Sequence, residues 1–362
     1  MVTSNPLTHT HLTHSEAQDV IDSIFHSPTS TPLDGASQSK PLPAFPHPGR
    51  ITHITELSSR GGTFNTCYLL HFPAPPAKHS TAITQLVLKI APPPNIRLLR
   101  YESTPTPLLA IEAYLLDHLT TNQPSLPVPR VLAYDDTLTL LDSPFLLTTF
   151  LPGVPLSDLR PELAKERARE IDFEVGRLFR GINEVRAGGG AGGWGGAWGM
   201  VSGKPGAGAW EWVGEFVGGL LRDAEDMRVL LPYGEIRTAV GMWGGLLDRG
   251  LEGEEIEFLE VDGGVLDVLD EPPHPHNPKL CILDFSDSSI LVDPDTCGIT
   301  GLLDFERAFW GDPIAQDIFL LESPGREDVI CGYNSQSTSL KNKKMPCAAR
   351  GRSSSRRCRE LL

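Results

Sequence analysis

Hydrophobic and polar residues alternate along several short segments in the first part of the chain. Three of them, ITHITELS (51–58), TCYLLHF (66–72) and QLVLKIA (85–91), follow one another closely. Two more, RVLAY (130–134) and FLLTTFL (145–151), come later. A period of two is typical of β-strands, whose side chains point to opposite faces in turn. The pattern therefore predicts a first lobe rich in β-strands.

Other segments show apolar residues at helical spacing. A short amphipathic helix is expected near the N-terminus, where Ser15-Glu16-Ala17-Gln18 resembles a capping box. A helix is also predicted from about Pro107 to Leu119, with proline in its first turn. Beyond Pro152-Gly153 the helical period dominates, over 161–185, 210–230 and 234–249. This change predicts an α+β protein of two lobes, the second of them helical.

Segments of biased composition separate these elements. Residues 27–49 are rich in Pro and Ser, 187–208 in Gly and Trp, and 252–271 hold nine Asp or Glu. We expect a linker, a flexible loop and a solvated excursion, in that order. The end of the chain is basic, Ser-rich and aperiodic, which predicts disorder. The expected parts are 1–50 (N-terminal helix and linker), 51–151 (N-lobe), 152–333 (helical C-lobe) and 334–362 (basic disordered tail).

The charge is unevenly distributed and limits the kinds of partner. The chain of 362 residues carries a net charge of −15, yet residues 334–362 carry eight Lys or Arg against one Glu, a local +7 that leaves −22 for the rest. A body that acidic repels nucleic acid and anionic membranes and favours cationic partners, although solubility alone also explains it. We therefore expect no nucleic-acid or membrane partner.

Composition indicates a cytoplasmic protein. The N-terminus lacks the basic start and apolar core of a secretory signal, and no apolar run approaches the length needed to span a bilayer. The six cysteines lack CxxC spacing, which is typical of reduced thiols in the cytosol.

Two charged residues stand within apolar elements. Lys89 lies in the strand segment LVLKI, where a lysine either extends to solvent or meets an anion inside a cleft. Glu112 lies three residues after Leu109 and four before Leu116, within the apolar stripe of its helix. A carboxylate is costly to bury without a cation. We therefore expect Lys89 and Glu112 to form an ion pair, with the lysine also reaching phosphate oxygens.

The turn SSRGGTFNT (58–66) places Gly61 and Gly62 before these residues, where the backbone can approach a phosphate closely. It lacks both the GxGxxG and the P-loop spacing, and a plain hairpin turn explains it about as well.

Two aspartates flank a predicted hairpin. The apolar runs 290–292 and 299–303 are separated by Asp293-Pro294-Asp295-Thr296-Cys297-Gly298, a clear turn. Pairing of these runs returns Asp304 to the neighbourhood of the loop that follows Asp284. The two carboxylates can then share one cleft, where one positions an acceptor hydroxyl and the other binds Mg²⁺, as phosphoryl transfer requires. The alternative is that both are turn and capping aspartates.

The same hairpin carries a resemblance. ILVDPDTCGITGLLDFERAFWGDP, with LPVPRVLAYD, SPFLLTTFLPGVPL and LLPYGEIR, resembles segments of the aminoglycoside phosphotransferase and choline kinase family. The likeness runs from about 51 to 333 and suggests a divergent, fungal-type member. It implies a bilobal protein-kinase-like fold, a nucleotide-binding N-lobe, and dependence on ATP and Mg²⁺.

The resemblance also implies roles for single residues. Lys89 is similar to the family's phosphate-contacting lysine and Glu112 to its helix partner. Asp284 falls where the family has its catalytic aspartate. The remaining implied positions are Asp304 and Ser289 for the metal, and Thr149, Phe150 and Leu151 for the segment that meets the adenine ring.

The catalytic loop departs from the family's pattern. The family has His-Gly-Asp followed five positions later by Asn, whereas this chain has Ile282-Leu283-Asp284 and then Ser289. Two functions therefore stay open. One is an ATP- and Mg²⁺-dependent phosphotransferase acting on a small-molecule hydroxyl, and the other is a pseudokinase-like binding or regulatory module.

Overall fold

A five-stranded antiparallel sheet forms the first part of the molecule. The computed structural model describes residues 12–26, 46–57, 65–74, 83–92, 108–185, 199–200, 209–251, 278–311, 313, 316, 318 and 325–335, and the structural statements below concern these residues. The strands lie in the order β1-β2-β3-β5-β4. Their bounds are His53–Glu56 (β1), Thr66–His71 (β2), Gln85–Ile90 (β3), Val131–Asp135 (β4) and Phe145–Thr149 (β5). All five strands that the alternating pattern predicts are confirmed.

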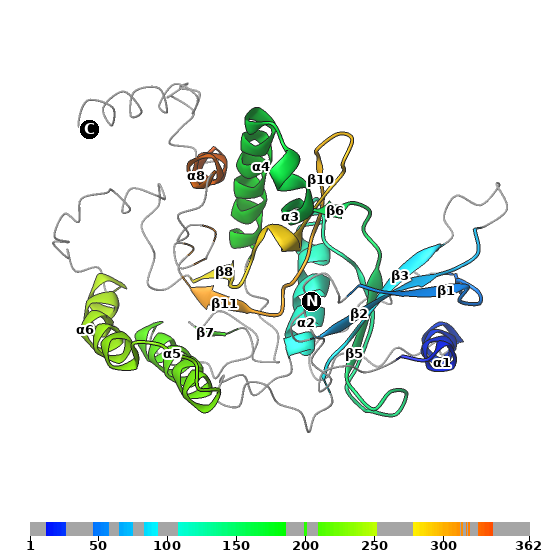
Figure 1. Ribbon diagram of the computed structural model, residues 1–362, viewed down its shortest axis with the longest axis horizontal. Coiled ribbons are helices and arrows are strands. Elements are labelled where there is room, and N and C mark those ends of the chain that lie inside the picture. The colour runs from blue at the N-terminus through cyan, green and yellow to red at the C-terminus, as the bar shows by residue number, and fades with distance from the viewer. Residues whose placement is uncertain are drawn as a thin grey trace.

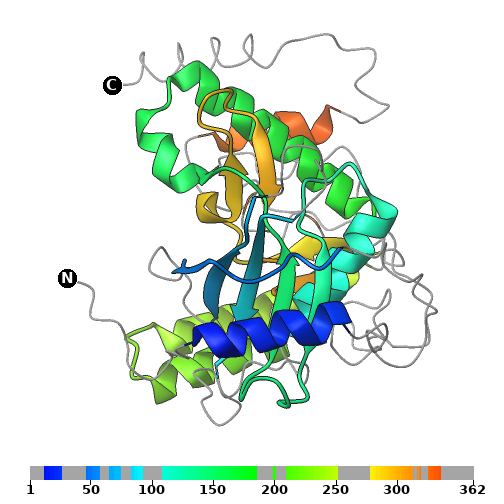
Figure 2. The same cartoon turned by 90° about the vertical axis from the view of Figure 1, so that its right-hand side faces the viewer.

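Two helices cover opposite faces of this sheet (Figures 1 and 2). Helix α1 (His14–His26) packs its Val20 and Ile21 against Leu88 and its alternate neighbours on β3. Helix α2 (Leu108–Asn122) packs Leu116 on the other face, in the same cluster as Leu146 of β5. The alternation of β3 therefore sends its leucines toward α1 and Lys89 toward α2.

The capping box of α1 lies two residues earlier than predicted. Because the helix begins at His14, Thr13 is its N-cap: the Glu16 amide donates to Thr13 Oγ1 at 3.2 Å, and the Thr13 amide donates to Glu16 Oε2 at 2.8 Å. The Ser15 and Gln18 pair expected from the sequence does not cap the helix. Both Thr13-x-x-Glu16 and Ser15-x-x-Gln18 fit the spacing, so local sequence alone does not choose between them.

Two small sheets support the rest of the molecule. The predicted hairpin is confirmed: β9 (Ile290–Val292) pairs with β10 (Ile299–Leu302), and β6 (Val154–Pro155) adds a third strand beside β9. The other sheet has the order β7-β11-β8 and was not predicted. Its strands are Gly199–Met200 (β7), Lys279–Ile282 (β8) and Ala308–Gly311 (β11).

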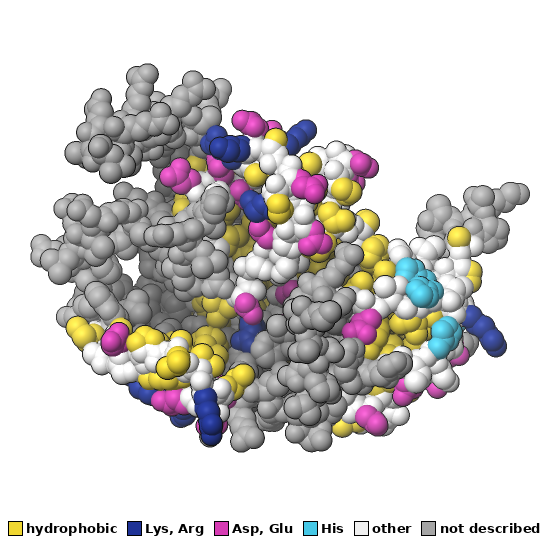
Figure 3. All heavy atoms as spheres, in the orientation of Figure 1, with side chains coloured by type: hydrophobic (Ala, Val, Ile, Leu, Met, Phe, Trp, Pro, Cys, Tyr) yellow, Lys and Arg dark blue, Asp and Glu magenta, His cyan; other side chains and the backbone are white. Residues whose placement is uncertain are grey.

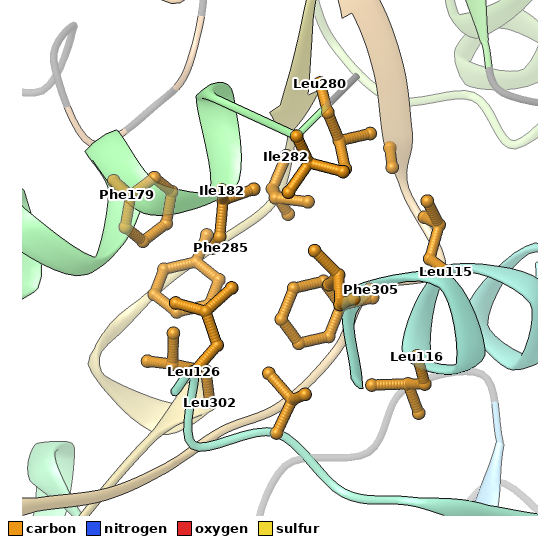
Figure 4. Close-up of a cluster of buried hydrophobic side chains, with 14 of the residues drawn as sticks. Leu115, Leu116, Leu126, Phe179, Ile182, Leu280, Ile282, Phe285, Leu302 and Phe305 are labelled. Atoms are coloured by element: carbon orange, nitrogen blue, oxygen red, sulfur yellow. The ribbon is translucent and has the colours of Figure 1, made fainter. Parts of the chain in front are cut away.

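The predicted C-lobe helices are also confirmed. They are α4 (Lys165–Asn183), α5 (Ala209–Asp226) and α6 (Tyr233–Leu251), with the short α3 (Leu156–Leu159), η2 (Arg160–Glu162), η3 (Asp287–Ser289) and α8 (Arg326–Asn334) besides. A buried cluster joins α4 to the β8–β10 region and to α2 (Figure 4). This cluster is the core on which the candidate site rests.

Several predicted features lie partly or wholly outside the described residues. They are the linker up to residue 45, the acidic segment 252–271 and the tail beyond 335. Strand β7 lies within the Gly/Trp-rich segment expected as a loop, and the neighbouring ranges 187–198 and 201–208 are not described.

Hydrophobic side chains gather over α5 and α6 (Figure 3), and Leu230, which follows α5, is 99% exposed. No helix in the described ranges is long and apolar enough to cross a membrane. Cys67, Cys281 and Cys297 form no disulfide, as expected of reduced thiols, whereas Cys331 in α8 is disulfide-bonded, so the expectation of a reduced thiol is wrong there.

Helices α4 and α8 are in backbone contact through two glycines. A Cβ built on Gly176 of α4 would overlap the carbonyl oxygen of Val329, and one on Gly332 of α8 would overlap that of Phe173. Each glycine therefore permits an approach that any other residue would prevent. Arg169 adds an ion pair to Asp328 at 2.9 Å across the same contact.

We expect Gly332→Ala to lower the free energy of unfolding by about 1 to 3 kcal/mol, because the added methyl forces α8 away from α4. Gly241→Ala in α6 is the matched control, since nothing lies within 4 Å of its added Cβ. That change should instead stabilise the protein by roughly 0.5 to 1 kcal/mol through helix propensity. Urea denaturation of both variants checks the opposite signs; equal effects would contradict the close contact.

Candidate active site

Lys89 is a largely buried lysine at the centre of the sheet. It lies on β3, opposite Cys67 of β2 and Leu146 of β5, and its side chain is 13% exposed. Its Nζ donates to Glu112 Oε2 at 2.8 Å, so the predicted ion pair is formed. Glu112 lies on the buried stripe of α2, with its side chain 7% exposed. Strand and helix thus bring the two charges together inside the protein.

Asp304 brings a second carboxylate to the same lysine. It follows β10, and its Oδ1 accepts a hydrogen bond from Lys89 Nζ at 3.1 Å. Its Oδ2 accepts from Ser289 Oγ at 3.2 Å. The Asp304 side chain is 48% exposed, so it lies at the edge of the cluster where a ligand can reach it.

Glu306 is a third carboxylate, which sequence reasoning missed. Its Oε2 lies 4.0 Å from Lys89 Nζ and accepts a hydrogen bond from Asn65 Nδ2 at 2.6 Å. Its position two residues after Asp304 was the available signal, because a carboxylate that close in sequence can reach the same lysine. The sequence offers no signal for Asn65, since it is 241 positions away from its partner Glu306.

The pKa values reflect one cation among three carboxylates. Burial by itself would lower the pKa of Lys89, but Glu112, Asp304 and Glu306 raise it well above its usual value. Burial raises the pKa of Glu112 to about 7, against the opposing charge of Lys89. Burial would also raise the pKa of Asp304, yet the charge and hydrogen bond of Lys89, with a hydrogen bond from Ser289, lower it. The cluster therefore holds more negative than positive charge near neutral pH.

Asp284 lies just after β8, and its side chain is 76% exposed. Its Oδ2 is 3.7 Å from Nε of Arg307, whose carbonyl accepts from the Leu283 amide at 2.7 Å. Asp284 thus contacts the segment that carries Asp304, while Asp304 bonds to Ser289 in the loop that begins at Asp284. The chain brings both predicted carboxylates to adjoining segments.

Both aspartates have left-handed backbones. The φ angle is 58° at Asp284 and 63° at Asp304, where residues other than glycine are uncommon. Such conformations cost on the order of 1 to 3 kcal/mol and persist when the surrounding structure imposes them. Such conformations cluster at functional sites. Leu138, Arg228 and Cys297 share this geometry, so it supports the two aspartates only together with their chemistry.

A buried amide network fixes β8 ahead of Asp284. Asn183 Nδ2 donates to the Leu280 carbonyl at 2.5 Å, and Gln316 Oε1 accepts from the Ile282 amide at 3.0 Å. Gln316 Nε2 also donates to Asn183 Oδ1 at 3.3 Å. The Ile282 side chain is fully buried in the apolar cluster (Figure 4). Backbone hydrogen bonds and core packing therefore hold the position at which the resemblance would place a histidine.

The predicted nucleotide-contacting residues are only partly described. Gly61 and Gly62 lie outside the described residues. Thr149 ends β5, and its Oγ1 accepts from the Arg130 amide at 2.9 Å. Phe150 and Leu151 then lead from the five-stranded sheet toward β6. A Cβ built on Gly301 of β10 would lie 2.9 Å from Leu151, so the segment of Phe150 and Leu151 packs on the hairpin that carries Asp304.

Metal-binding groups are few in this cluster. The described residues contain no group of three or more His, Cys, Asp or Glu arranged to hold a metal. Mg²⁺ commonly uses one or two carboxylates together with substrate phosphates. The half-exposed Asp304, the excess negative charge and the hydroxyl of Ser289 fit such a partial site.

The sequence of this chain matches a protein family. The sequence model described as "Phosphotransferase enzyme family" matches residues 78–327. No curated protein matches the chain significantly.

Solved structures of aminoglycoside phosphotransferases are similar at low identity. The APH(4)-Ia ternary complex with AMP-PNP and hygromycin B has 15% identity and a TM-score of 0.42, covering 78% of this chain and 84% of that one. The streptomycin–ATP–APH(2″)-IIa complex has 13% identity and a TM-score of 0.46, covering 78% of each chain. The aminoglycoside-3′-phosphotransferase of type VIII has 19% identity and a TM-score of 0.41, covering 74% and 81%.

Proposed function

Because the chain belongs to the phosphotransferase enzyme family, we propose that it transfers the terminal phosphoryl group of ATP to a hydroxyl of a small molecule, with Mg²⁺. The observation that carries this proposal is the Lys89–Glu112–Asp304 cluster, in which one buried amine contacts two carboxylates from different elements. Phosphoryl transfer depends mainly on positioning and on neutralising charge, and this cluster supplies groups for both.

Lys89 is the residue that we assign to the nucleotide phosphates. Its high pKa keeps the amine protonated, and Glu112 fixes its direction at 2.8 Å. A buried, oriented ammonium group attracts phosphate oxygens more strongly than a solvated one. We place the turn at Gly61 and Gly62 over the phosphates, and Thr149, Phe150 and Leu151 beside the adenine.

Asp304 and Ser289 are the residues that would hold Mg²⁺. The cation would neutralise charge on the phosphates. Ser289 is 2% exposed and already donates to Asp304, so its hydroxyl keeps that carboxylate in a defined orientation. Both side chains come from segments joined by the β9–β10 hairpin, which fixes their separation.

Asp284 is the residue that we assign to the acceptor. Its exposed carboxylate can orient the acceptor hydroxyl and receive its proton. The acceptor oxygen then bonds to the terminal phosphorus, the bond from that phosphorus to the bridging oxygen breaks, and ADP leaves. The net charge of −15 favours a cationic acceptor, such as an amino sugar or amino alcohol.

The alternative function is a pseudokinase-like binding or regulatory module. The observation that favours it is the catalytic loop, where Ser289 replaces the family's asparagine and the buried side chain of Ile282 offers no hydrogen bond. A single hydroxyl reaches less far than an amide oxygen toward a second metal ion.

Nucleotide titrations with and without Mg²⁺ test the proposal, beside an ATP-consumption screen over amino sugars, amino alcohols and small sugars. We expect Mg²⁺-dependent ATP binding and acceptor-dependent ADP release. Nucleotide binding without turnover on any acceptor would favour the regulatory module. Absence of nucleotide binding would contradict the phosphotransferase.

A further inference from the structure

Arg160 forms an ion-pair network beside the candidate site that the function proposed so far does not use. It lies on η2, and its guanidinium donates through Nε to Asp287 Oδ2 and through Nη2 to Asp287 Oδ1, the latter at 2.9 Å. The same group donates to Asp172 of α4, from Nη2 at 2.7 Å and from Nη1 at 3.2 Å. One arginine therefore joins η2 and α4 to the loop that contains Asp287.

This network is partly shielded from water, most fully at Asp172. The side chain of Asp172 is 6% exposed, that of Arg160 28% and that of Asp287 34%. Gly325, with φ of 108°, begins α8 against Asp172, and a Cβ there would overlap the Asp172 carboxylate. Bidentate pairs of arginine with carboxylate fix geometry as well as contributing energy, and shielding strengthens them.

Asp287 lies in the middle of the segment that carries the candidate chemistry, residues 284–289, which we name the 284–289 loop. Phe285 anchors one side of the loop in the core, with its ring 4.8 Å from that of Phe179. Asp287 anchors the other side through Arg160. The Ser289 amide donates to the Ser286 carbonyl at 2.9 Å, so fixing Asp287 also fixes Ser289.

The left-handed backbone of Asp284 needs such support, because the loop would otherwise relax to a more common conformation. Ile282 adds no side-chain hydrogen bond to the loop, since it lies in the apolar cluster. We propose that Arg160 is a positioning residue for phosphoryl transfer, which holds the 284–289 loop through Asp287. This inference rests on the proposed function.

Kinetics of variants of the full chain give the first test. Arg160→Met should lower kcat on the order of a hundredfold, because a displacement of about 1 Å at a reacting group costs that much. The Kd for ATP measured without Mg²⁺ should change little, since Arg160 does not contact the Lys89 cluster in the described structure. Asp287→Asn should lower kcat similarly, and the double variant should be no slower than either single one.

Hydrogen exchange gives a second test that does not need activity. In Arg160→Met the Ser289 amide should exchange faster than in the unaltered protein. Arg167→Gln is the matched control, because Arg167 pairs with Glu170 on the exposed side of α4, and it should leave exchange and kcat unchanged. If Arg160→Met does not fold, Arg160→Lys replaces it, since lysine keeps the charge but cannot form the two-pronged contact.

The outcomes separate this inference from the proposed function. An unchanged kcat in folded Arg160→Met would overturn the positioning role. The same holds if the kcat losses of Arg160→Met and Asp287→Asn multiply in the double variant. If the unaltered protein turns over no acceptor, the proposed function fails, and Ser289 exchange alone decides whether Arg160 holds the loop. Unchanged exchange in that case overturns the inference as well.

Discussion

Replacing Lys89 by methionine is expected to lower the free energy of unfolding by about 3 to 5 kcal/mol at pH 8. The change removes the one cation that faces Glu112, Asp304 and Glu306 in the described structure. Glu112 and Glu306 have side chains only 7% and 13% exposed, so water cannot replace the lost charge. Urea denaturation measures the effect.

The cost should depend on pH with a definite sign. The pKa of Glu112 is raised to about 7 in the folded protein, from 4.5, although Lys89 lowers it. Without Lys89 the folded pKa rises further, so the folded state binds a proton more tightly than the unfolded state. The contribution of protonated Glu112 to the stability of Lys89→Met is therefore fully present below about pH 4.5, and it is lost as pH rises through the folded pKa. We expect a smaller loss at pH 5 than at pH 8; a loss independent of pH would exclude the carboxylates as its cause.

Two variants serve as controls. Glu112→Gln should cost less than Lys89→Met, because Lys89 keeps Asp304 at 3.1 Å and no uncompensated charge is created. Lys165→Met, at the exposed first turn of α4, should leave stability nearly unchanged. Equal losses in all three would mean that the charge of Lys89 has no special role.

Asp304→Asn is expected to lower turnover by roughly a hundred- to a thousandfold, because metal-assisted charge stabilisation contributes several kcal/mol and each 1.4 kcal/mol is about tenfold. Nucleotide binding should also lose its dependence on Mg²⁺. The fold should persist, since Lys89 keeps Glu112 at 2.8 Å and the amide oxygen can still accept from Ser289. Isothermal titration with and without Mg²⁺, together with initial rates, measures both effects.

Asp295→Asn is the matched control on the same hairpin. Asp295 is exposed in the turn between β9 and β10, so the same chemical change there should leave binding and rate unaltered. Mg²⁺-dependent affinity that survives Asp304→Asn would remove Asp304 from the metal site, although the Lys89 cluster would still stand as a phosphate-binding candidate.

Local patterns predicted the parts of the structure that local physics determines. Alternation located the strands, helical spacing located α4, α5 and α6, and the turn chemistry of 293–298 located the β9–β10 hairpin. The Lys89–Glu112 pair followed from two charges that each stood in an apolar pattern. A charged residue in an apolar pattern predicts its partner, because a buried charge requires an opposite charge.

Contacts between distant polar residues could not be predicted in this way. Asn65 and Glu306 are 241 positions apart, and Arg160 and Asp287 are 127 apart. Each of these residues would be unremarkable on a solvated surface, and only the topology brings the partners together. The β8–β11 pairing was missed for another reason, since both strands are only four residues long.

The close contact of α4 with α8 has a consequence for folding during synthesis. Arg169 and Asp328, which join the two helices, are 159 positions apart. When α4 leaves the ribosome, the face that α8 covers, with buried residues such as Val175, must wait for a segment made much later. Distant contacts form slowly, and exposed apolar surface promotes aggregation meanwhile. The nascent C-lobe therefore exposes this apolar face until α8 has been made, and aggregation is favoured during that interval.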